Sequence, residues 1–374
     1  MAASFMAVRH VRVLRALAIG THPHPELPTT VEWIESSHPY PDARSEAAAN
    51  RALDVAQQVQ SGEALVILLS GGASALMAAP IASLSLADKI ETTRLMMKSG
   101  ADIHALNTVR RHLSNVKGGR LAAACAGTTV TLAISDVVGD DLNAIGSGPG
   151  VPDPTTWADA AAAVARFGGD LHASEVHHVI ERGMAGAIAD TPKAGDASLK
   201  RAVARVIGSR RDAMEGARLS AAALGYRTVV IDEPVTGDAR EVAPRWLARV
   251  RELARGVARP ACVISSGETT VRVTGSGRGG RNLEFALAIA EEMASPAASA
   301  MASVGTDGID GSSGVAGGIV DSTTISRASA LRLERPGSYL AANDSFSFFA
   351  PLDDAVRLGR TDTNVGDIQV ILID

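Results

Sequence analysis

The sequence is poor in aromatic residues and cysteines. Aromatic residues make up 3% of its 374 positions and hydrophobic residues 46%, so the core is expected to consist mainly of Ala, Val, Leu and Ile. The two cysteines, Cys125 and Cys262, are too far apart for metal-ligand spacing. We interpret them as free structural thiols in a reducing compartment.

Long apolar runs and a surplus of basic residues are also missing. No apolar run approaches the roughly 20 residues of a membrane span, and Arg9, Arg12 and Arg15 interrupt the N-terminal stretch, which argues against a signal peptide. Lys and Arg number 36 against 41 Asp and Glu, which gives a net charge of −5. We therefore expect a cytoplasmic protein with no membrane or nucleic-acid partner, which binds any anionic substrate through local Arg and Lys residues.

Short apolar runs of strand length alternate with helical segments along the chain, which predicts an α/β protein. A length of 374 residues suggests two domains. Residues 168–199 lose periodicity and are the expected connection. We place an N-terminal α/β domain with a parallel sheet at residues 1–195 and a second α/β domain at residues 200–374.

An acidic, glycine-rich loop follows the apolar run 129–133. Asp136 comes directly after the run, and Asp140, Asp141 and the sequence Gly-Ser-Gly-Pro-Gly at residues 146–150 follow. Open α/β sheets bind ligands at the carboxyl ends of their strands, so Asp136 is a candidate ligand for a cation. An ordinary acidic surface turn is the alternative.

A second glycine-rich turn follows the apolar run 64–69. It contains Ser70, Gly71, Gly72 and Ser74 and precedes a helix, an arrangement that favours a phosphate or carboxylate. The turn matches neither the Walker A nor the dinucleotide-binding pattern, and close helix packing explains such glycines equally well.

Hydrogen-bond donors are concentrated in and after the expected helix 103–113. Asn107 and Arg110 lie one turn apart on one face of this helix, and Lys117 follows it. This concentration of donors in an acidic protein indicates an anion site, with a solvated helical face as the alternative.

The second half repeats the pattern of strands that end in polar loops. An expected strand at 262–265 ends near Glu268, and another is expected at 270–274. The loop 275–282 contains four glycines with Arg278, Arg281 and Asn282 before a helix at 283–293, where helix dipole and guanidinium charge both favour an anion. Asp307 lies in an acidic loop typical of a hard cation, although the loop lacks EF-hand spacing.

Several anion cradles combined with an oxygen-ligated cation are what phosphoryl transfer requires. The residues alone therefore predict a soluble α/β enzyme that acts on a small anion with Mg²⁺ and a nucleotide.

Seven ordered blocks resemble the glycerate 2-kinase family of the class II or MOFRL type. They cover nearly the whole chain and read LLSGGASALM, NTVRRHLSNVKGGRLA, ISDVVGDDLNAIGSGPGVPDPTT, SSGETTVRVTGSGRGGRNLEFALA, SVGTDGIDGSSGVAGGIVDSTT, NDSF and TDTNVGDI. The resemblance implies ATP-dependent phosphorylation of D-glycerate to 2-phosphoglycerate. It also implies a Rossmann-like N-terminal domain and an active site in the cleft between two domains.

The resemblance also implies roles for the candidate residues. Arg281 would stabilise the transferred phosphoryl group. Asp136 would either bind Mg²⁺ together with Asp307 or orient the reacting hydroxyl. The implied substrate and nucleotide contacts are Ser70, Gly71, Gly72, Ser74, Asn107, Arg110, Lys117, Glu268, Arg278 and Asn282.

The sequence departs from the family at its start and near its end. Family members usually begin with a further strand and a Gly-Lys-Ala turn, whereas residues 1–6 resemble the helix that would follow that turn. Arg360 and Asp362 replace the usual Pro and Gly of a late loop. Two alternatives stay open: a hydroxypyruvate reductase that uses NAD(P)H, the name often given to members of this family, and, because the Gly-Lys-Ala turn is missing, an impaired homologue that binds glycerate or nucleotide without turnover. The oligomeric state also stays open, with a homo-oligomer as one alternative.

Overall fold

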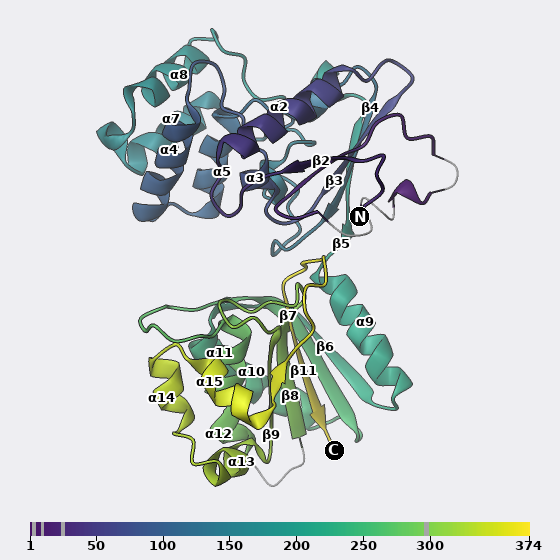
Figure 1. The fold of residues 1–374 in the computed structure, drawn as a ribbon, viewed down its shortest axis with the longest axis vertical. Helices are drawn as coiled ribbons and strands as arrows, with labels where there is room; N and C mark the ends of the chain where they lie inside the picture. The colour runs from purple at the N-terminus through teal and green to yellow at the C-terminus, as the bar shows by residue number, and fades with distance from the viewer. Residues whose placement is uncertain (2–4, 9–10, 24–26, 295–298) are drawn as a thin grey trace. The chain divides into compact units, whose positions relative to one another are not determined.

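A computed structural model describes residues 1, 5–8, 11–23, 27–294 and 299–374 (Figure 1). The chain forms two units, of which unit 1 comprises Met1–Ala133 and Asp140–Ile207 and unit 2 comprises Ile134–Gly139 and Gly208–Asp374. The main boundary thus follows residue 207, whereas the sequence placed it between residues 195 and 200. Residues 2–4, in the expected N-terminal helix, lie outside the described part.

Unit 1 contains parallel strand pairs. β3 (Ala64–Leu69) and β4 (Thr128–Ile134) pair in parallel, and β5 (Ala202–Gly208) joins β4 on its other side. β1 (Leu17–Gly20) and β2 (Glu32–Glu35) form a separate parallel pair. The continuous apolar sequence of β3, in which Ile67 and Leu69 are buried, is typical of a parallel strand covered on both faces.

The helices of unit 1 pack around a core that includes Met96, Leu106, Trp157 and Ile180. α8 contributes to this core although it lies in the segment 168–199, which the sequence suggests as a linker or excursion between domains and which the structure assigns to unit 1. The helices are α2 (Ala43–Gln57), α3 (Ala73–Leu76), α4 (Leu86–Lys98), α5 (Ile103–His112), α6 (Arg120–Ala123), α7 (Trp157–Arg166) and α8 (Ser174–Met184), with 3₁₀ turns η1 (Ile145–Ser147), η2 (Gly169–Leu171) and η3 (Ala197–Leu199).

Unit 2 is built on a six-stranded sheet of order β10-β9-β8-β11-β7-β6. β6 and β7 are parallel, whereas β11, the last strand of the sequence, is antiparallel to both neighbours, β7 and β8. The expected strand at 270–274 does not form beyond Thr270, the last residue of β7. The strands are β6 (Arg227–Asp238), β7 (Ala261–Thr270), β8 (Ser299–Gly305), β9 (Gly317–Asp321), β10 (Ala355–Val356) and β11 (Asp367–Ile373).

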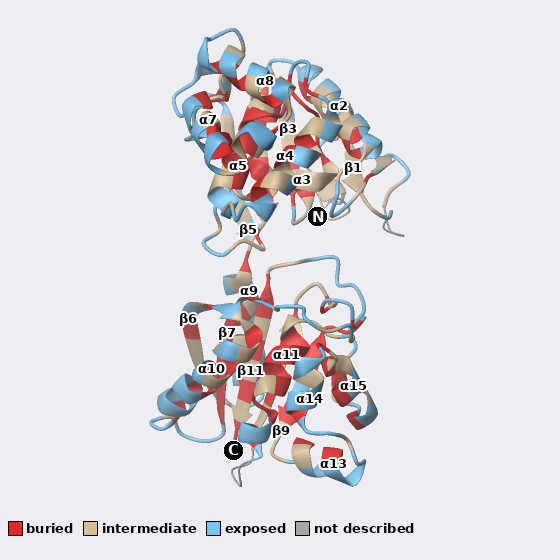
Figure 2. Cartoon of the chain, turned by 90° about the vertical axis from the view of Figure 1, so that its left-hand side faces the viewer, coloured by how far each residue is buried: buried red, intermediate tan, exposed pale blue. Residues whose placement is uncertain are grey.

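The core of unit 2 contains several of the chain's few aromatic residues. Trp246 packs edge-on against Phe285, and Phe348 packs edge-on against Phe349. Phe285 lies on α11, a helix that is almost entirely buried (Figure 2). The helices are α9 (Arg210–Ala223), α10 (Ala239–Ala254), α11 (Arg281–Ala288), α12 (Ala290–Met293), α13 (Thr324–Ala330), α14 (Pro336–Ala341) and α15 (Ser345–Phe349), followed by η4 (Ala350–Leu352).

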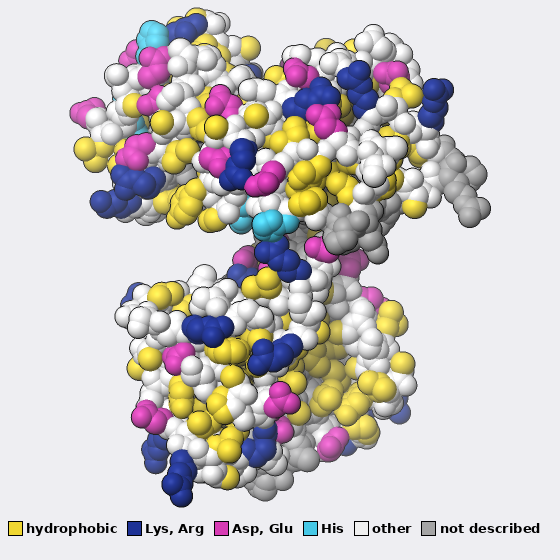
Figure 3. Space-filling model, in the orientation of Figure 1, with side chains coloured by type: hydrophobic (Ala, Val, Ile, Leu, Met, Phe, Trp, Pro, Cys, Tyr) yellow, Lys and Arg dark blue, Asp and Glu magenta, His cyan; other side chains and the backbone are white. Residues whose placement is uncertain are grey.

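The two units together confirm the predicted mixed α/β class. No described helix is long and apolar enough to cross a bilayer. On the face shown in Figure 3, Lys and Arg side chains are interspersed with Asp and Glu side chains, in keeping with the lack of a basic surplus in the sequence.

Candidate functional site

The strand register of unit 2 brings together polar residues that are distant in sequence. Asp367, the first residue of β11, lies opposite Gly267 of β7 and Gly305 of β8. Because β11 runs antiparallel to both strands, its start lies at their carboxyl ends. Glu268 follows Gly267, and Asp307 follows Gly305 by two residues.

Arg281, the first residue of α11, connects two of these carboxylates. Its Nε lies 2.7 Å from Asp367 Oδ2 and its Nη1 lies 3.0 Å from Glu268 Oε1. Asn282 Nδ2 donates a hydrogen bond to Asp367 Oδ1 at 2.9 Å. The side chain of Asp367 is completely buried, whereas that of Arg281 is 31% exposed. The guanidinium is thus held by carboxylates and keeps further N–H groups that these two pairs do not use.

Two more predicted residues belong to the same neighbourhood. Asn364 Nδ2 donates to Asp136 Oδ2 at 3.3 Å. Asp307 Oδ1 and Asn282 Nδ2 lie 3.1 and 3.5 Å from the position that a Cβ on Gly305 would occupy, so these two side chains are close together.

We call this set the Arg281 group. It contains five predicted site residues together with Asn364 and Asp367, which sequence reasoning did not select although both lie in the quoted block TDTNVGDI. The predicted members are Asp136, Glu268, Arg281, Asn282 and Asp307.

Burial and mutual repulsion disfavour charge on the carboxylates of the Arg281 group. Burial raises the pKa of Glu268, and the negative charges of Asp367 and Asp136 raise it further, while Arg281 acts in the opposite direction. Burial also raises the pKa of Asp367, although Arg281 and Asn282 partly offset the effect. Such a cluster attracts a cation or a proton.

The glycine-rich loop before α11 has a packing role. A Cβ on Gly275 would lie 2.1 Å from Ala342 O, and one on Gly277 would lie 2.3 Å from Asp344 Cβ. These glycines therefore permit close contact with the chain at residues 342–344.

An internal carboxylate already occupies the N-terminus of α11. The backbone N–H groups of Asn282 and Leu283 donate to Asp310 at 3.0 and 2.8 Å, and burial raises the pKa of Asp310 to about 6. Arg278 stacks on Phe346 at 4.6 Å and donates to Ser313 O, so it is not part of the Arg281 group. Of the two contributions that the sequence suggested, the helix N-terminus and the guanidinium charge, only that of Arg281 is available to a ligand anion here.

A second polar group lies in unit 1, where Lys117 Nζ donates to Ser74 O at 2.7 Å, to Ser74 Oγ at 3.1 Å and to Met77 O at 3.0 Å. The hydroxyls of Ser74 and Ser147 are 3.0 Å apart, and Ser147 donates to Asn107 Oδ1 at 3.1 Å. We call Ser74, Asn107, Lys117 and Ser147 the Lys117 group. Ser147 was not among the predicted contacts, although it lies in the Gly-Ser-Gly sequence after Asp136.

Positive charges near the Lys117 group are poorly compensated. Burial lowers the pKa of Lys117 to about 7, and the charge of Arg110 acts in the same direction. Burial also lowers the pKa of Arg110 and, together with the charges of Lys117 and Arg110, that of Lys89. No ion pair joins Arg110 to a carboxylate among the described residues. A neighbouring anion would therefore be stabilised here.

The turn after β3 is only partly associated with the Lys117 group through Ser74. Ser70 is exposed, and no hydrogen bond links it or Gly71 to this group within the described ranges. Gly72 has a φ of +82°, and a Cβ there would lie 3.0 Å from His38 Cδ2. Backbone conformation and packing thus account for Gly72 without a ligand.

The described residues contain no group of three or more His, Cys, Asp or Glu side chains arranged to hold a metal ion. The two predicted metal ligands, Asp136 and Asp307, are therefore not part of a metal site formed by protein side chains alone. Mg²⁺ often binds through one or two carboxylates and substrate phosphates, so this finding leaves such a shared site open.

Comparison with known proteins places the chain in a family. Residues 1–181 match the model of a domain of unknown function, DUF4147, and residues 261–367 match the MOFRL family. A putative hydroxypyruvate reductase of Agrobacterium vitis is 38% identical over 96% of this chain and 81% of the relative. The D-glycerate 2-kinase of Thermotoga maritima is 34% identical over 97% of this chain and 85% of the relative.

A crystal structure of a glycerate kinase from Thermotoga maritima has the same fold. It matches with a TM-score of 0.90 and 34% identity, over 100% of this chain and 88% of that chain. The chain is therefore similar to these relatives in sequence and in fold, and the similarity covers both units. The chain belongs to the glycerate 2-kinase family, in which a DUF4147 domain is combined with a MOFRL domain.

Proposed function

We propose that this protein transfers the γ-phosphoryl group of ATP to the 2-hydroxyl group of D-glycerate. Relatives named glycerate kinase or glycerate 2-kinase support the reaction. The structural observation that carries the proposal is the Arg281 guanidinium, held by Asp367 and Glu268 with further N–H groups available. Positioned positive charge of this kind is the main protein contribution to phosphoryl transfer.

Within the Arg281 group, each side chain has a distinct proposed role. Arg281 stabilises the negative charge on the transferred phosphoryl oxygens, and Asp367 positions Arg281 through its Nε. Asp136 orients the reacting hydroxyl of glycerate by accepting its hydrogen bond. Asn282 and Glu268 contact substrate or nucleotide.

We propose that the Arg281 group binds Mg²⁺ through two of its carboxylates together with nucleotide phosphates. The negative charge of Asp136 contributes to the raised pKa of Glu268, so a cation near these groups would relieve their repulsion. We propose Asp136 and Asp307 as ligands that share the ion with nucleotide phosphates. When bound, the ion would neutralise phosphate charge during transfer.

For unit 1 we propose that the Lys117 group and Arg110 bind an anionic part of a substrate. The support is the uncompensated charge of Arg110 beside Lys117. Ser70, Gly71 and Gly72 stay predicted contacts of the same anion, and Arg278 stays a predicted nucleotide contact.

A reductase is the second candidate because two relatives are named putative hydroxypyruvate reductase. The glycine-rich loops do not favour a reductase. The turn after β3 lacks the G-x-G-x-x-G pattern that binds a dinucleotide, and in the loop Gly275–Gly280, which has that spacing, Gly275 and Gly277 pack against residues 342–344.

Two assays on the purified protein separate the candidates. ATP and D-glycerate with Mg²⁺ should yield ADP and 2-phosphoglycerate, detected by conversion with enolase. NADH or NADPH with hydroxypyruvate should show no oxidation of the cofactor. Oxidation of NAD(P)H without ADP formation would refute the kinase proposal, and binding of ATP and glycerate without either reaction would identify an impaired homologue.

A further inference from the structure

Arg110, on α5, has no partner among the described residues. Its side chain is half-buried, and its guanidinium group forms no hydrogen bond or ion pair with any of them. All three guanidinium nitrogens nevertheless stay accessible to solvent. Burial without a partner lowers the pKa of Arg110, so the protein carries a charge that it does not stabilise. Such a group is typical of a ligand site.

The Lys117 group fixes the direction of the neighbouring Asn107 amide. Because the Lys117 ammonium group can only donate, Ser74 Oγ accepts from it at 3.1 Å and donates its own hydroxyl proton to Ser147. Ser147 in turn donates to Asn107 Oδ1 at 3.1 Å. The amide oxygen therefore faces Ser147. The NH₂ group of Asn107 has no acceptor in the described part of unit 1 and stays accessible to solvent.

Asn107 and Arg110 offer these free donors side by side. They are three residues apart on α5, so their side chains are neighbours on the helix surface. Two nearby amines add positive potential but have no N–H group to offer: Lys117 uses all three of its own, and the buried Lys89 donates to Leu113 O at 2.8 Å. An anion attracted to this face would thus contact the two free donors.

The two donors suit a carboxylate better than a chain of phosphates. A carboxylate carries one negative charge, and its two oxygens match the parallel N–H groups of a single guanidinium. The phosphates of ATP carry several charges, and one accessible guanidinium would leave most of them without a partner. The site therefore fits a small monoanionic acid.

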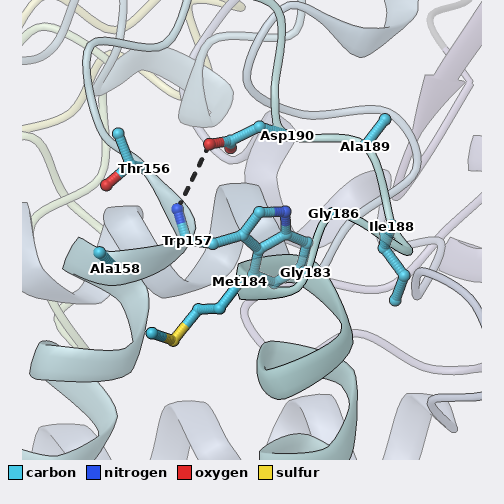
Figure 4. Close-up of a pocket in the computed structure, with 9 residues that line it drawn as sticks. All are labelled: Thr156, Trp157, Ala158, Gly183, Met184, Gly186, Ile188, Ala189 and Asp190. Atoms are coloured by element: carbon cyan, nitrogen blue, oxygen red, sulfur yellow. Dashed lines mark hydrogen bonds between the residues drawn. The ribbon is translucent and has the colours of Figure 1, made fainter.

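A hollow elsewhere in unit 1 has the opposite character. It measures about 330 Å³ and lies at the start of α7 and the end of α8 (Figure 4). Its lining contains no Lys, Arg or His, and its one charged residue, Asp190, would repel an anion. The indole N–H of Trp157 is completely buried there and out of reach of a ligand. This hollow is thus no alternative site for a carboxylate.

We propose that Arg110 and Asn107 bind the carboxylate of D-glycerate. Both carboxylate oxygens accept hydrogen bonds from the Arg110 guanidinium, and one of them also accepts from Asn107 Nδ2. Lys117 is a positioning residue, because it acts through Ser74 and Ser147 to direct the Asn107 NH₂ group toward the ligand. The choice of D-glycerate as the acid rests on the proposed kinase function.

Binding and kinetics of the full chain test this site. In calorimetric titrations with D-glycerate, without and with ADP and Mg²⁺, Arg110→Met and Asn107→Asp should each bind at least about tenfold more weakly than wild type, since each loses a donor to a charged oxygen. Arg110→Lys keeps the charge and should lose less. In ADP-release assays, Arg110→Met should raise the KM for D-glycerate by a similar factor and change the KM for ATP by less than about twofold.

A neutral analogue tests the role of charge. D-glyceramide, the amide of the same acid, should bind to wild type at least about tenfold more weakly than D-glycerate. It should bind to Arg110→Met as well as D-glycerate does, because that variant lacks the guanidinium that distinguishes the two.

Stability separates this role from a structural one. Arg110→Met removes a charge that repels Lys117 and leaves no buried group unpaired, so without ligand it should unfold at the same or a higher urea concentration than wild type. Arg94→Met is the matched control, because Arg94 forms an exposed ion pair with Glu91 on α4, and it should bind D-glycerate like wild type.

The carboxylate site is overturned if wild type shows no saturable binding of D-glycerate, if Arg110→Met or Asn107→Asp binds it like wild type, or if Arg110→Met is less stable than wild type. A rise in the KM for ATP alone would also overturn it. Binding of D-glycerate that depends on Arg110 but yields no ADP would refute the kinase proposal and leave the carboxylate site standing. ADP formation by Arg110→Met with an unchanged KM for D-glycerate would do the reverse.

Discussion

Replacement of Arg281 by alanine tests the centre of the proposed kinase site. The substitution removes the cation that pairs with Asp367 at 2.7 Å and with Glu268 at 3.0 Å. Loss of one positioned charge-stabilising donor typically lowers kcat by about 10²–10³-fold, which corresponds to about 3–4 kcal/mol of transition-state stabilisation. We expect a decrease of at least about tenfold, with the larger values if Arg281 contacts the phosphoryl group in the transition state.

The same substitution should also destabilise unit 2. Asp367 is completely buried, so it would lose a charged partner and keep the neutral donor Asn282. Removal of one partner of a buried ion pair costs about 3–5 kcal/mol. We expect the lower end, because the pKa of Asp367 is already raised and the carboxyl can take up a proton.

Kinetic and stability measurements distinguish the two effects. Steady-state ADP release at saturating ATP and D-glycerate gives kcat per folded molecule, and urea unfolding gives the free energy of unfolding. Arg218→Ala is the matched control, because Arg218 forms an exposed ion pair with Glu215 on α9, and it should change neither quantity. Wild-type kcat in folded Arg281→Ala would refute the proposed charge stabilisation.

Three further predictions concern the groups that support the site. Burial raises the pKa of the Asp310 carboxyl group from 3.8 to about 6, so the folded state binds the proton of this group more tightly than the unfolded state does. Protonation of Asp310 therefore stabilises the folded state fully below about pH 4. This stabilisation, about 3 kcal/mol, is lost as the pH rises through 6. Urea unfolding from pH 4 to 7 should show this decline in wild type relative to Asp310→Asn, and equal pH profiles would contradict it. Lys117→Met removes the donor shared by Ser74 and Met77 and should lower the free energy of unfolding by about 2–4 kcal/mol, whereas a neutral effect would show that the lysine is dispensable for the turn after β3. Ser147 has a φ of +60° and its hydroxyl links Ser74 to Asn107, so Ser147→Ala should lower the free energy of unfolding by about 1–2 kcal/mol. Ser147→Gly should be about 1 kcal/mol more stable than Ser147→Ala, because glycine adopts the left-handed backbone conformation without strain. A glycine variant less stable than the alanine variant would contradict this reasoning.

Elements with strong local signals could be predicted from the sequence. The sequence predicts the apolar run of β3 with its observed bounds, Ala64–Leu69, and the helix expected at 103–113 is α5, Ile103–His112. Each depends on neighbouring residues alone. By contrast, β7 continues through Ser265, Ser266 and Gly267, which have the composition of a turn. Flanking strands on both sides bury this segment, and that effect is invisible in a local window.

The Arg281 group was only partly predictable for the same reason. The composition of loop 275–282 indicated Arg281, but its partner Asp367 is 86 residues away and is brought to it by the register of β11. The loop glycines suggest anion binding in the sequence, whereas the positions of Ala342 and Asp344 explain two of them by packing. Residue types alone cannot distinguish these causes, because both require the absence of a side chain.

The position of β11 constrains how unit 2 can be made during translation. This strand, Asp367–Ile373, is the last of the sequence yet lies between β7 and β8 in the sheet. While the ribosome still holds these residues, β7 and β8 lack their shared neighbour and expose unpaired edges. Unit 2 can therefore complete its sheet only once residues 367–373 have left the ribosome, and a nonsense mutation shortly before Asp367 would prevent the sheet from forming and remove the carboxylate that holds Arg281.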